Sequence, residues 1–216
     1  MTKVIGFGAG GHARVIVDIL TMIGGFEIVG LLDQDHDLWG KNVLGVPVLG
    51  GDELRDEMYA RGVRSAFIGL GSIVNAGPRK RLYEEACAMG FAIVSAIHPR
   101  AVVAESATLG DGPMVMAGAV INPSARVGNN VIVNTGAIVE HDCVIGDHSH
   151  IATGARLGGA VRIGAGSHVG PAASIREGIT VGEGAIVGAG AVVIRDVPDR
   201  TVVAGVPASV LRTVES

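Results

Sequence analysis

The stretch VGNNVIVNTGAIVEHDCVIGDHSHI, residues 127–151, decides the fold of this chain. An aliphatic residue occupies every sixth position of it, and the same step continues without a break from Ile97 to Val193, which gives seventeen aliphatic anchors. The strands of an ordinary β-sandwich repeat with a period of two, which does not produce an unbroken period of six. The pattern therefore predicts the hexapeptide repeat of a parallel β-helix.

The other positions of the hexads agree with this prediction. The fourth residue after an anchor is mostly small, as at Ala119, Ala137 and Ala155, and the residue directly after an anchor is often glycine. We expect each hexad to supply one short strand and a turn, with the anchor pointing inward and three hexads closing one triangular coil. Nearly six coils should stack at the strand spacing of about 4.8 Å. Resemblance to known hexapeptide proteins implies a left-handed helix, an exception to the right-handed crossover rule.

The composition of the chain changes near residues 95–99. All seven aromatic residues lie before residue 92, and the second half is built mainly from Gly, Ala, Val and Ile. A domain without aromatic residues has a core that is too narrow for rings or is made of repeats. We therefore predict a first domain over residues 1–96, an all-β left-handed β-helix over residues 97–198 and a C-terminal tail over residues 199–216.

The first domain begins with a glycine-rich turn. Residues 2–8 predict a buried strand, and Gly6-Phe7-Gly8-Ala9-Gly10-Gly11 fits the pattern G-x-G-x-x-G. A helix over about residues 12–22 and a second strand over residues 26–32, which ends at Asp33, complete a βαβ unit. The sequence thus predicts a Rossmann-like α/β domain, extended by a strand over residues 64–70 and a helix over residues 78–89.

The glycine turn has three possible roles. Glycines allow the backbone to approach a diphosphate, whose charge is favoured at the N-terminus of the following helix. A bound dinucleotide such as NAD would need a second mononucleotide half, for which the roughly 95 residues before the repeat leave no room. A nucleotide-linked substrate is the favoured interpretation, and a purely structural turn is the alternative.

The overall composition excludes several classes of protein. The net charge is −4 and no basic block is present, which argues against a nucleic-acid partner. No uncharged apolar run approaches the ~20 residues of a membrane span, so we expect no membrane insertion. The start MTKVIGFGAG lacks a cleavable signal pattern, and the two cysteines make no disulfide framework. These features predict a cytoplasmic protein.

Four of the seven histidines, namely His141, His148, His150 and His168, lie in the predicted β-helix. His141 is the third residue of its hexad and should point outward, with an acid on either side of it. Its unperturbed pKa near 6.5 suits a general base that deprotonates an amine or a hydroxyl group. Asp142 could fix its tautomer or raise its basicity. The alternative is a solvated surface histidine.

His150 and His168 are separated by 18 residues and should stack on the same edge of successive coils. Zinc sites of the gamma carbonic anhydrase type use three histidines at subunit interfaces, but their spacing differs from the spacing found here. We therefore predict no metal site. An outward histidine is useful only if something covers it, which favours a homotrimer whose grooves hold the pantetheine arm of a cofactor.

The chain resembles the family of sialic-acid O-acetyltransferases and bacillosamine-type sugar N-acetyltransferases from end to end. The motifs that carry the resemblance are Gly8-Ala-Gly-Gly-His-Ala13, Leu32-Asp33, Asn134 with Glu140-His141-Asp142, Ile145-Gly-Asp147, His150-Ile151 and Ala204-Gly205-Val-Pro207-Ala208. The resemblance implies transfer of an acetyl group from acetyl-CoA to the 4-amino group of a nucleotide-linked sugar used in lipopolysaccharide biosynthesis. An O-acetyltransferase and a non-catalytic nucleotide-sugar binding protein are the alternatives.

The resemblance also implies roles for individual residues. His141 would be the general base and Asp142 its orienting carboxylate. Acetyl-CoA would lie along His150, Gly159, Pro171 and Ala189. The nucleotide-linked amino sugar would contact Gly10, Gly11, His12, Asp33, Gln34, Gly71 and Asn134.

Two further points follow from the same resemblance. Relatives that bind uridine carry a second acid where Gln34 stands, so the base remains open and guanine is compatible with this residue. The transfer would be direct, within a ternary complex, because Cys143 is a small inward residue of its hexad. A backbone N–H, for which Gly159 is a candidate, would stabilise the oxyanion.

Overall fold

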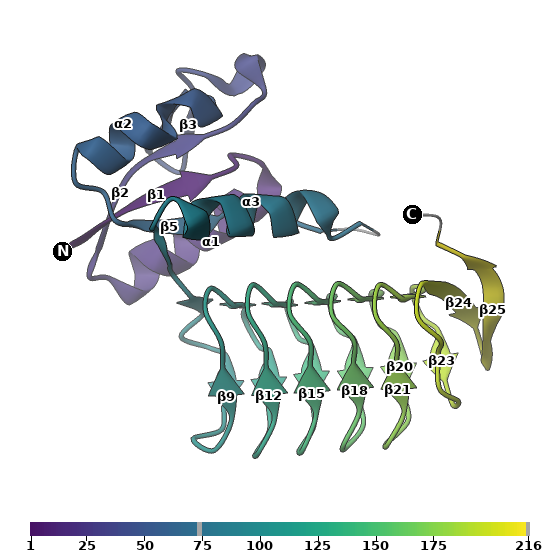
Figure 1. Cartoon of the computed structure of the whole chain (residues 1–216). Coiled ribbons are helices and arrows are strands. Elements are labelled where there is room, and N and C mark those ends of the chain that lie inside the picture. Colours follow the sequence, from purple (N-terminus) through teal and green to yellow (C-terminus); the bar gives the residue numbers. More distant parts are fainter. Residues whose placement is uncertain (73–74, 215–216) are drawn as a thin grey trace. The chain divides into compact units, whose positions relative to one another are not determined.

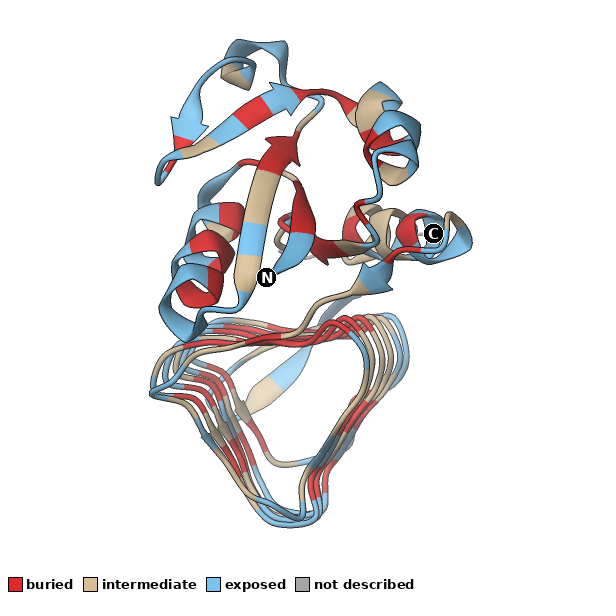
Figure 2. Cartoon of the chain, turned by 90° about the vertical axis from the view of Figure 1, so that its left-hand side faces the viewer, coloured by how far each residue is buried: buried red, intermediate tan, exposed pale blue. Residues whose placement is uncertain are grey.

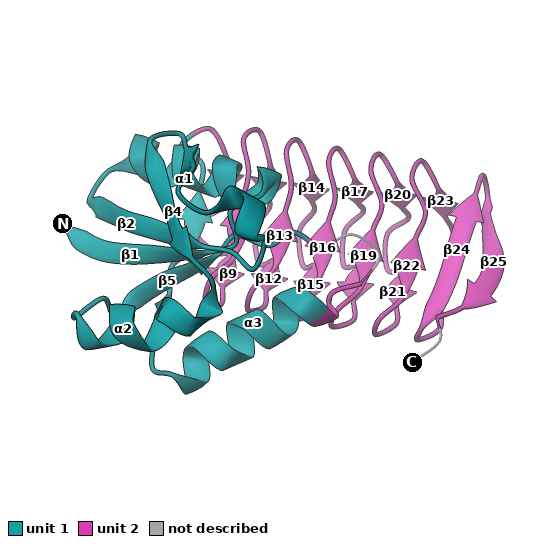
Figure 3. Ribbon diagram, turned by 90° about the horizontal axis from the view of Figure 1, so that it is seen from above, with its two compact units in different colours: residues 1–71, 78–99 teal, residues 72–77, 100–216 magenta. Residues whose placement is uncertain are grey.

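The computed structural model describes residues 1–72 and 75–214 of the chain. The chain divides into two compact units, which are coloured separately in Figure 3. Unit 1 consists of Met1–Gly71 and Pro78–Pro99, and unit 2 consists of Ser72–Gly77 and Arg100–Ser216. The division thus lies three residues beyond the predicted boundary, and a short segment between a strand and a helix of unit 1 belongs to unit 2.

Unit 1 is an α/β domain built on a six-stranded sheet (Figure 1). The strand order is β3-β4-β2-β1-β5-β6, and all neighbours are parallel except the β3–β4 pair. The strands are β1 (Thr2–Phe7), β2 (Phe26–Leu32), β3 (Asn42–Val43), β4 (Val46–Gly50), β5 (Ser65–Ile68) and β6 (Ala92–Ile93). The helices are α1 (Gly11–Ile23), α2 (Arg55–Ala60) and α3 (Gly77–Ala88), with 3-10 turns η1 (His36–Leu38) and η2 (Asp52–Leu54).

The topology of this sheet determines where a ligand can bind. Strand β1 lies between β2 and β5, so the chain crosses to opposite sides of β1. In open α/β sheets the crevice for a ligand lies outside the carboxyl ends of the strands at such a switch point. The predicted βαβ unit, the strand near residues 64–70 and the helix near residues 78–89 are confirmed. Strands β3, β4 and β6 and helix α2, which are short, were not predicted from the sequence.

The repeat of unit 2 forms a hexapeptide β-helix, whose triangular coils are seen end-on in Figure 2. Each strand pairs in parallel with the strand one coil further along, as Val120 does with Ile138. The three faces are β10-β13-β16-β19-β22, β8-β11-β14-β17-β20-β23 and β9-β12-β15-β18-β21. We refer to them as faces A, B and C in this order.

The strands of the three faces are only two residues long. Those of face A are Met114–Val115, Ile132–Val133, His150–Ile151, His168–Val169 and Ile186–Val187. Those of face B are Val102–Val103, Val120–Ile121, Ile138–Val139, Arg156–Leu157, Ser174–Ile175 and Val192–Val193. Those of face C are Thr108–Leu109, Arg126–Val127, Val144–Ile145, Arg162–Ile163 and Thr180–Val181. The predicted anchor is the second residue of each strand.

The interior of the β-helix follows the predicted hexad pattern. From Val115 to Val193 every anchor is buried, and so is the small residue four positions after it from Ala119 onward. One residue of every hexad, from Gly112 to Gly190, adopts a positive φ at the corner of the coil. Glycine adopts this conformation without strain, and asparagine and aspartate tolerate it better than most residues.

The predicted C-terminal tail is a regular element. Strand β24 (Thr201–Gly205) pairs in parallel with β22 and in antiparallel fashion with β25 (Ala208–Thr213). Val203 is buried next to Val187 and extends the row of inward aliphatic residues beyond the last hexad. The segment therefore caps the sheet of face A within unit 2, and its last two residues lie outside the described part of the chain.

Candidate functional site

The glycine-rich turn of unit 1 contains two kinds of glycine. A Cβ on Gly6 would lie 2.4 Å from the side chains of Leu31 and Phe67, and Gly8 has a φ of +104° and packs against the backbone of Gly69. In contrast, a Cβ on Gly10 or Gly11 would meet nothing within 4 Å. The first two glycines are required by packing, whereas the last two leave open space at the N-terminus of α1.

This N-terminus is suited to an anion. Gly10 is the N-cap residue and has no side chain that could accept a hydrogen bond from the first turn. The first N–H groups of a helix lack partners within the helix and carry a partial positive charge. Predicted substrate residue His12 stands in this first turn, and a Cβ on Gly71 would lie 3.6 Å from the Cβ of His12. Gly10, Gly11, His12 and Gly71 thus form one group.

Asp33 fastens the glycine-rich turn to the end of β2. Its Oδ2 atom accepts a hydrogen bond from the Ala9 N–H at 2.7 Å, and its Oδ1 atom accepts one from the Asp35 N–H at 2.9 Å. The indole N–H of Trp39 donates to the backbone oxygen of Asp33 at 2.8 Å. A carboxylate that accepts backbone N–H groups orders both segments. Asp33 therefore has a structural role in addition to any contact with a ligand.

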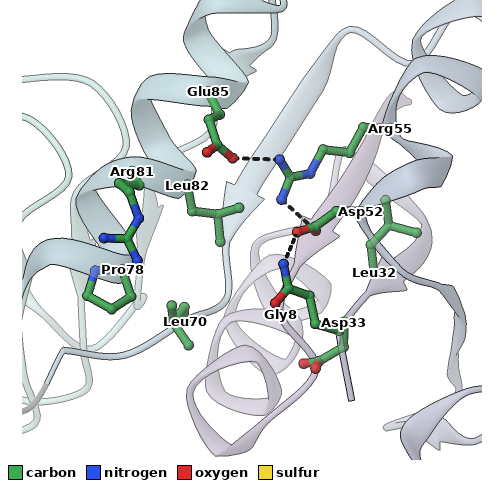
Figure 4. A pocket seen from close by; sticks show the side chains of 11 residues that line it. Gly8, Leu32, Asp33, Asp52, Arg55, Leu70, Pro78, Arg81, Leu82 and Glu85 are labelled. Atoms are coloured by element: carbon green, nitrogen blue, oxygen red, sulfur yellow. Dashed lines mark hydrogen bonds and ion pairs between the residues drawn. The ribbon is translucent and has the colours of Figure 1, made fainter. Parts of the chain in front are cut away.

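A cavity of about 270 Å³ lies at the carboxyl ends of the strands of unit 1 (Figure 4). It contains the predicted substrate residues Asp33 and Gln34, but not the group around Gly10. A row of hydrogen-bonded and ion-paired side chains forms one wall. Gln34 donates to Asp52 at 2.6 Å, and Arg55 bridges Asp52 at 2.5 Å and Glu85 at 2.8 Å. The other lining residues are Gly8, Leu32, Leu70, Pro78, Arg81 and Leu82.

Most of this cavity wall was not predicted from the sequence. Asp52, Arg55, Arg81 and Glu85 come from η2, α2 and α3, and the ion-paired residues Arg55 and Glu85 are 30 residues apart in the chain. Arg55 is 7% exposed, and its guanidinium lies 5.1 Å from the ring centroid of Phe7. No sequence signal marks an arginine that will be buried between two acids in this way.

Arg79 supports the same edge of the sheet through hydrogen bonds to the backbone. It is 1% exposed, and its Nη1 donates to the backbone oxygens of Ile68 at 2.7 Å and Leu70 at 2.6 Å. Burial lowers its pKa to about 9, so the side chain is still charged at neutral pH. Arg79 thus holds the end of β5 in place next to the cavity.

In unit 2, His141 and Asp142 form a hydrogen-bonded pair at the corner between faces B and C. The His141 Nδ1 atom lies 2.8 Å from Asp142 Oδ2, and both side chains are more than half exposed. Because a carboxylate only accepts, Nδ1 carries the proton and Nε2 is left to act as a base. The hydrogen bond with Asp142 raises the pKa of His141, and the negative charges of Asp142 and Glu140 add to this effect.

The local backbone explains why Asp142, and not Glu140, reaches the ring. Asp142 stands at the corner position with a φ of +60°, which turns its side chain back towards His141. Glu140 precedes the corner, and its carboxylate accepts a hydrogen bond from the backbone N–H of His141 at 3.3 Å. Asp142, which the sequence favoured as the orienting acid, is thus the acid that contacts the ring.

Gly159 lies one coil beyond His141 and directly under its ring. A Cβ at this position would lie 2.7 Å from both the Cε1 and the Nε2 atoms of His141. The backbone of the two coils is joined by the hydrogen bond from Ala160 N–H to the oxygen of His141 at 2.8 Å. Within the described residues, no hydrogen bond engages the N–H of Gly159. This leaves a donor beside the proposed base.

His150 is held in one tautomer by its neighbours. Asn134 Oδ1 accepts from the Thr135 N–H at 2.7 Å, so its amide nitrogen faces His150 Nε2 at 3.1 Å. His150 Nε2 must therefore accept, and Nδ1 donates to the backbone oxygen of Ser72 at 2.5 Å. His150 is 7% exposed, and its ring stacks edge-on against His168 at 4.9 Å, as the spacing predicted. Burial lowers the pKa of His168.

The remaining residues predicted along acetyl-CoA lie at a different corner. Pro171 and Ala189 are exposed at the corner between faces A and B, where the Gly190 N–H donates to the Pro171 oxygen at 2.8 Å. His141 and Gly159 lie at the corner between faces B and C. The two groups therefore flank face B on opposite sides.

Comparison with known proteins connects these features to a family. Residues 3–86 match the family described as PglD N-terminal domain, and residues 124–159 and 160–195 match the bacterial transferase hexapeptide repeat. The H141A variant of GDP-perosamine N-acetyltransferase from Caulobacter crescentus, solved with CoA and GDP-perosamine, is 38% identical over 97% of both chains, with a TM-score of 0.91. The chain belongs to the PglD-type family of hexapeptide sugar N-acetyltransferases.

Other relatives agree with this assignment. The acetyltransferase domain of PglB from Neisseria gonorrhoeae FA1090, solved with acetyl coenzyme A, is 37% identical over 97% of this chain and 99% of that domain, with a TM-score of 0.88. WeeI from Acinetobacter baumannii AYE, at 20% identity and a TM-score of 0.62, shares the fold alone. A comparison with curated proteins gave no match. The predicted family, fold class and acetyltransferase activity are thus confirmed for this PglD-type chain.

The described residues lack two kinds of feature. Among residues 1–72 and 75–214, none of the helices combines the length and the apolar character that a membrane crossing requires. The same part of the chain contains no cluster of three or more His, Cys, Asp or Glu side chains that could hold a metal ion.

Proposed function

We propose that this acetyltransferase moves the acetyl group of acetyl-CoA to the 4-amino group of a sugar linked to a nucleoside diphosphate, with GDP-perosamine as the best candidate. The observation that carries the proposal is the His141–Asp142 pair over the bare backbone of Gly159. Structures of the C. crescentus relative described as H141A and H141N variants hold CoA with GDP-perosamine. A product of this type would serve O-antigen assembly.

Unit 1 would bind the nucleotide part of the substrate. The diphosphate would lie at the open N-terminus of α1, where Gly10 and Gly11 leave room for it. His12 and Gly71 would face the sugar, and Asp33 and Gln34 would face the nucleoside from the wall of the cavity. Asn134 would act on the substrate through His150, because both polar groups of its amide are engaged within the chain.

The reaction would proceed by direct transfer. The amine attacks the thioester carbon, a C–N bond forms, and His141 Nε2 takes the proton that the amine loses. The N–H of Gly159 would stabilise the oxyanion of the tetrahedral intermediate. As the C–S bond breaks, His141 returns its proton to the thiolate of CoA. Cys143 takes no part, because it is buried and its pKa is raised to about 11 by desolvation.

Acetyl-CoA would bind along unit 2 in a homotrimer. Gly159 and the pair Pro171–Ala189 lie on opposite sides of face B, so a groove lined by all of them would use a corner from each of two subunits. The outward residues of three neighbouring strands of face B are aliphatic, and one of them, Val102, is 61% exposed. Apolar faces of this kind are typical of subunit interfaces. Sedimentation at micromolar concentration should give three chains per particle, and a fully active monomer would exclude this arrangement.

The experiment that tests the activity is a turnover assay with acetyl-CoA and 4-amino sugars linked to GDP, UDP and dTDP. Release of CoA together with an amide product establishes N-acetylation. Equal release with the 4-hydroxy sugars would favour an O-acetyltransferase, and binding of nucleotide sugar without release of CoA would favour a non-catalytic binding protein. The assay in the absence of added metal shows whether the chain needs one.

A further inference from the structure

The cavity of unit 1 has a charge that differs from the charge expected of a diphosphate site. Three carboxylates line it, those of Asp33, Asp52 and Glu85, against two guanidinium groups, those of Arg55 and Arg81. An excess of negative charge repels phosphate. The phosphates are instead favoured at the N-terminus of α1. The cavity is thus suited to the uncharged end of the nucleotide, which is the base.

The walls of the cavity support the same assignment. Leu32, Leu70, Pro78 and Leu82 provide apolar surface that can cover the faces of a flat ring. In Figure 4, Leu70 and Leu82 face the cavity opposite the acidic wall. Binding sites of small molecules commonly combine apolar walls with a few fixed polar groups that decide specificity. The polar groups here include three carboxylates, which only accept hydrogen bonds, beside the two guanidinium groups.

The three carboxylates differ in the bonds they already make. Both oxygens of Asp33 accept from backbone N–H groups, and both oxygens of Asp52 are engaged by Gln34 and Arg55. Glu85 binds Arg55 through Oε2, and within the described residues its Oε1 makes no hydrogen bond. Arg55 is buried and ion-paired to Asp52 as well, so it fixes the direction of Glu85.

We propose that Glu85, held by Arg55, accepts hydrogen bonds from the base of the nucleotide and selects guanine. This inference rests on the proposed function and names its specificity residue. Guanine carries two adjacent donors, N1–H and the N2 amino group, which can share one carboxylate. Hypoxanthine has only the first donor. Adenine places the lone pair of N1 beside its amino group, and uracil and thymine flank their single N–H with two carbonyl oxygens, which a carboxylate repels.

Direct titration of the full chain with GDP, IDP, ADP, UDP and dTDP tests the proposal without acetyl-CoA. We expect GDP to bind about tenfold or more tightly than IDP, since IDP lacks one hydrogen bond to a charged acceptor. The pyrimidine nucleotides should bind more weakly still. Equal affinities for GDP and IDP, or tighter binding of UDP, would overturn the assignment while leaving the acetyltransferase reaction intact.

The variant Glu85→Gln keeps the shape of the side chain and removes its charge. The ratio of the GDP and IDP affinities should fall close to one, because GDP loses more than IDP does when the charged acceptor is removed. The matched control is Glu84→Gln, because Glu84 is the adjacent acid on α3, pairs loosely with Lys80 at 3.8 Å and does not line the cavity. A ratio that is unchanged in Glu85→Gln contradicts the role of Glu85.

Two outcomes separate this inference from the function on which it rests. If none of the five nucleotides binds and no 4-amino sugar is turned over, the proposed function fails. If the nucleotides bind without preference for GDP, only the role of Glu85 fails. Should Glu85→Gln not fold, the GDP-to-IDP ratio of the unaltered chain decides the question by itself.

Discussion

The two units of this protein assemble their chemistry in different ways. In unit 2 the pair His141–Asp142 and the glycine under it lie at one corner of a regular repeat, where the position of each side chain follows from its place in the hexad. In unit 1 the cavity brings together residues from the ends of β1 and β2, from η2 and α2, and from α3. A repeat makes a site local in sequence, whereas an open α/β sheet gathers a site from distant segments.

Replacing His141 should give the largest effect, because it is the general base in the proposed reaction. His141→Asn keeps a similar shape but cannot accept a proton at neutral pH. We expect kcat to fall by about 10²–10⁴-fold, as for other general bases. Both substrates should still bind, as measured by titration of the variant. A variant that keeps more than about a tenth of the native kcat is inconsistent with a general base at this position.

Gly159→Ala should be next, since a methyl group would lie 2.7 Å from the His141 ring and must displace it. Misplacing a catalytic group by about 1 Å can lower the rate by about 10²-fold, and kcat should fall by a factor of this order. The φ of Gly159 is not positive, so the backbone itself tolerates alanine and the melting temperature should change little. If kcat is unaffected, the ring does not need the position that the structure gives it.

Asp33→Ala examines unit 1 and should act mainly on the sugar substrate. It removes the two hydrogen bonds that order the glycine-rich turn and the start of η1. We expect the KM for the nucleotide sugar to rise about tenfold, the value of one hydrogen bond to a charged group. The KM for acetyl-CoA should stay unchanged. Asp37→Ala is the control, because Asp37 is exposed nearby and does not line the cavity. Equal effects on the two KM values would contradict the proposal that unit 1 binds the nucleotide sugar and unit 2 binds acetyl-CoA.

Asp142→Asn should have a smaller effect on kcat than His141→Asn, because the base survives it. The pH profile is the sharper measurement. The hydrogen bond with Asp142 raises the pKa of His141, and the base must be unprotonated to act, so kcat/KM should fall on the acid side of that raised pKa. Without the carboxylate the acid limb should move to lower pH. A limb that does not move would show that another group titrates there.

The same contrast explains what the sequence could predict. The period of six fixes which residues of unit 2 point inward, so the β-helix and the outward position of His141 follow from counting along the chain. The positive φ at Asp142 also recurs every six residues, although its effect on the side chain becomes visible only in the structure. In contrast, Arg55 and Glu85 meet because α2 and α3 pack on one sheet, and no local pattern encodes this contact.

The prediction for His150 shows a different limit. The spacing of 18 residues correctly placed its ring against that of His168. It could not show that the backbone oxygen of Ser72, which is 78 residues earlier in the chain, accepts a hydrogen bond from its Nδ1–H group. Periodicity predicts neighbours within a repeat. Contacts between the repeat and an insertion from another part of the chain need the three-dimensional structure.

The corner with positive φ has a consequence for how such an enzyme can change. From Gly112 to Gly190 this corner recurs once per hexad and accommodates Gly, Ser, Asn, Asp, His and Ala on the same frame. Each corner can therefore carry different residues without a change in the backbone. The corners along one edge stack from coil to coil at about 4.8 Å, the spacing between neighbouring strands. Moving a histidine and an acid by one coil would shift the proposed reacting centre along the axis of the β-helix without disturbing the anchors.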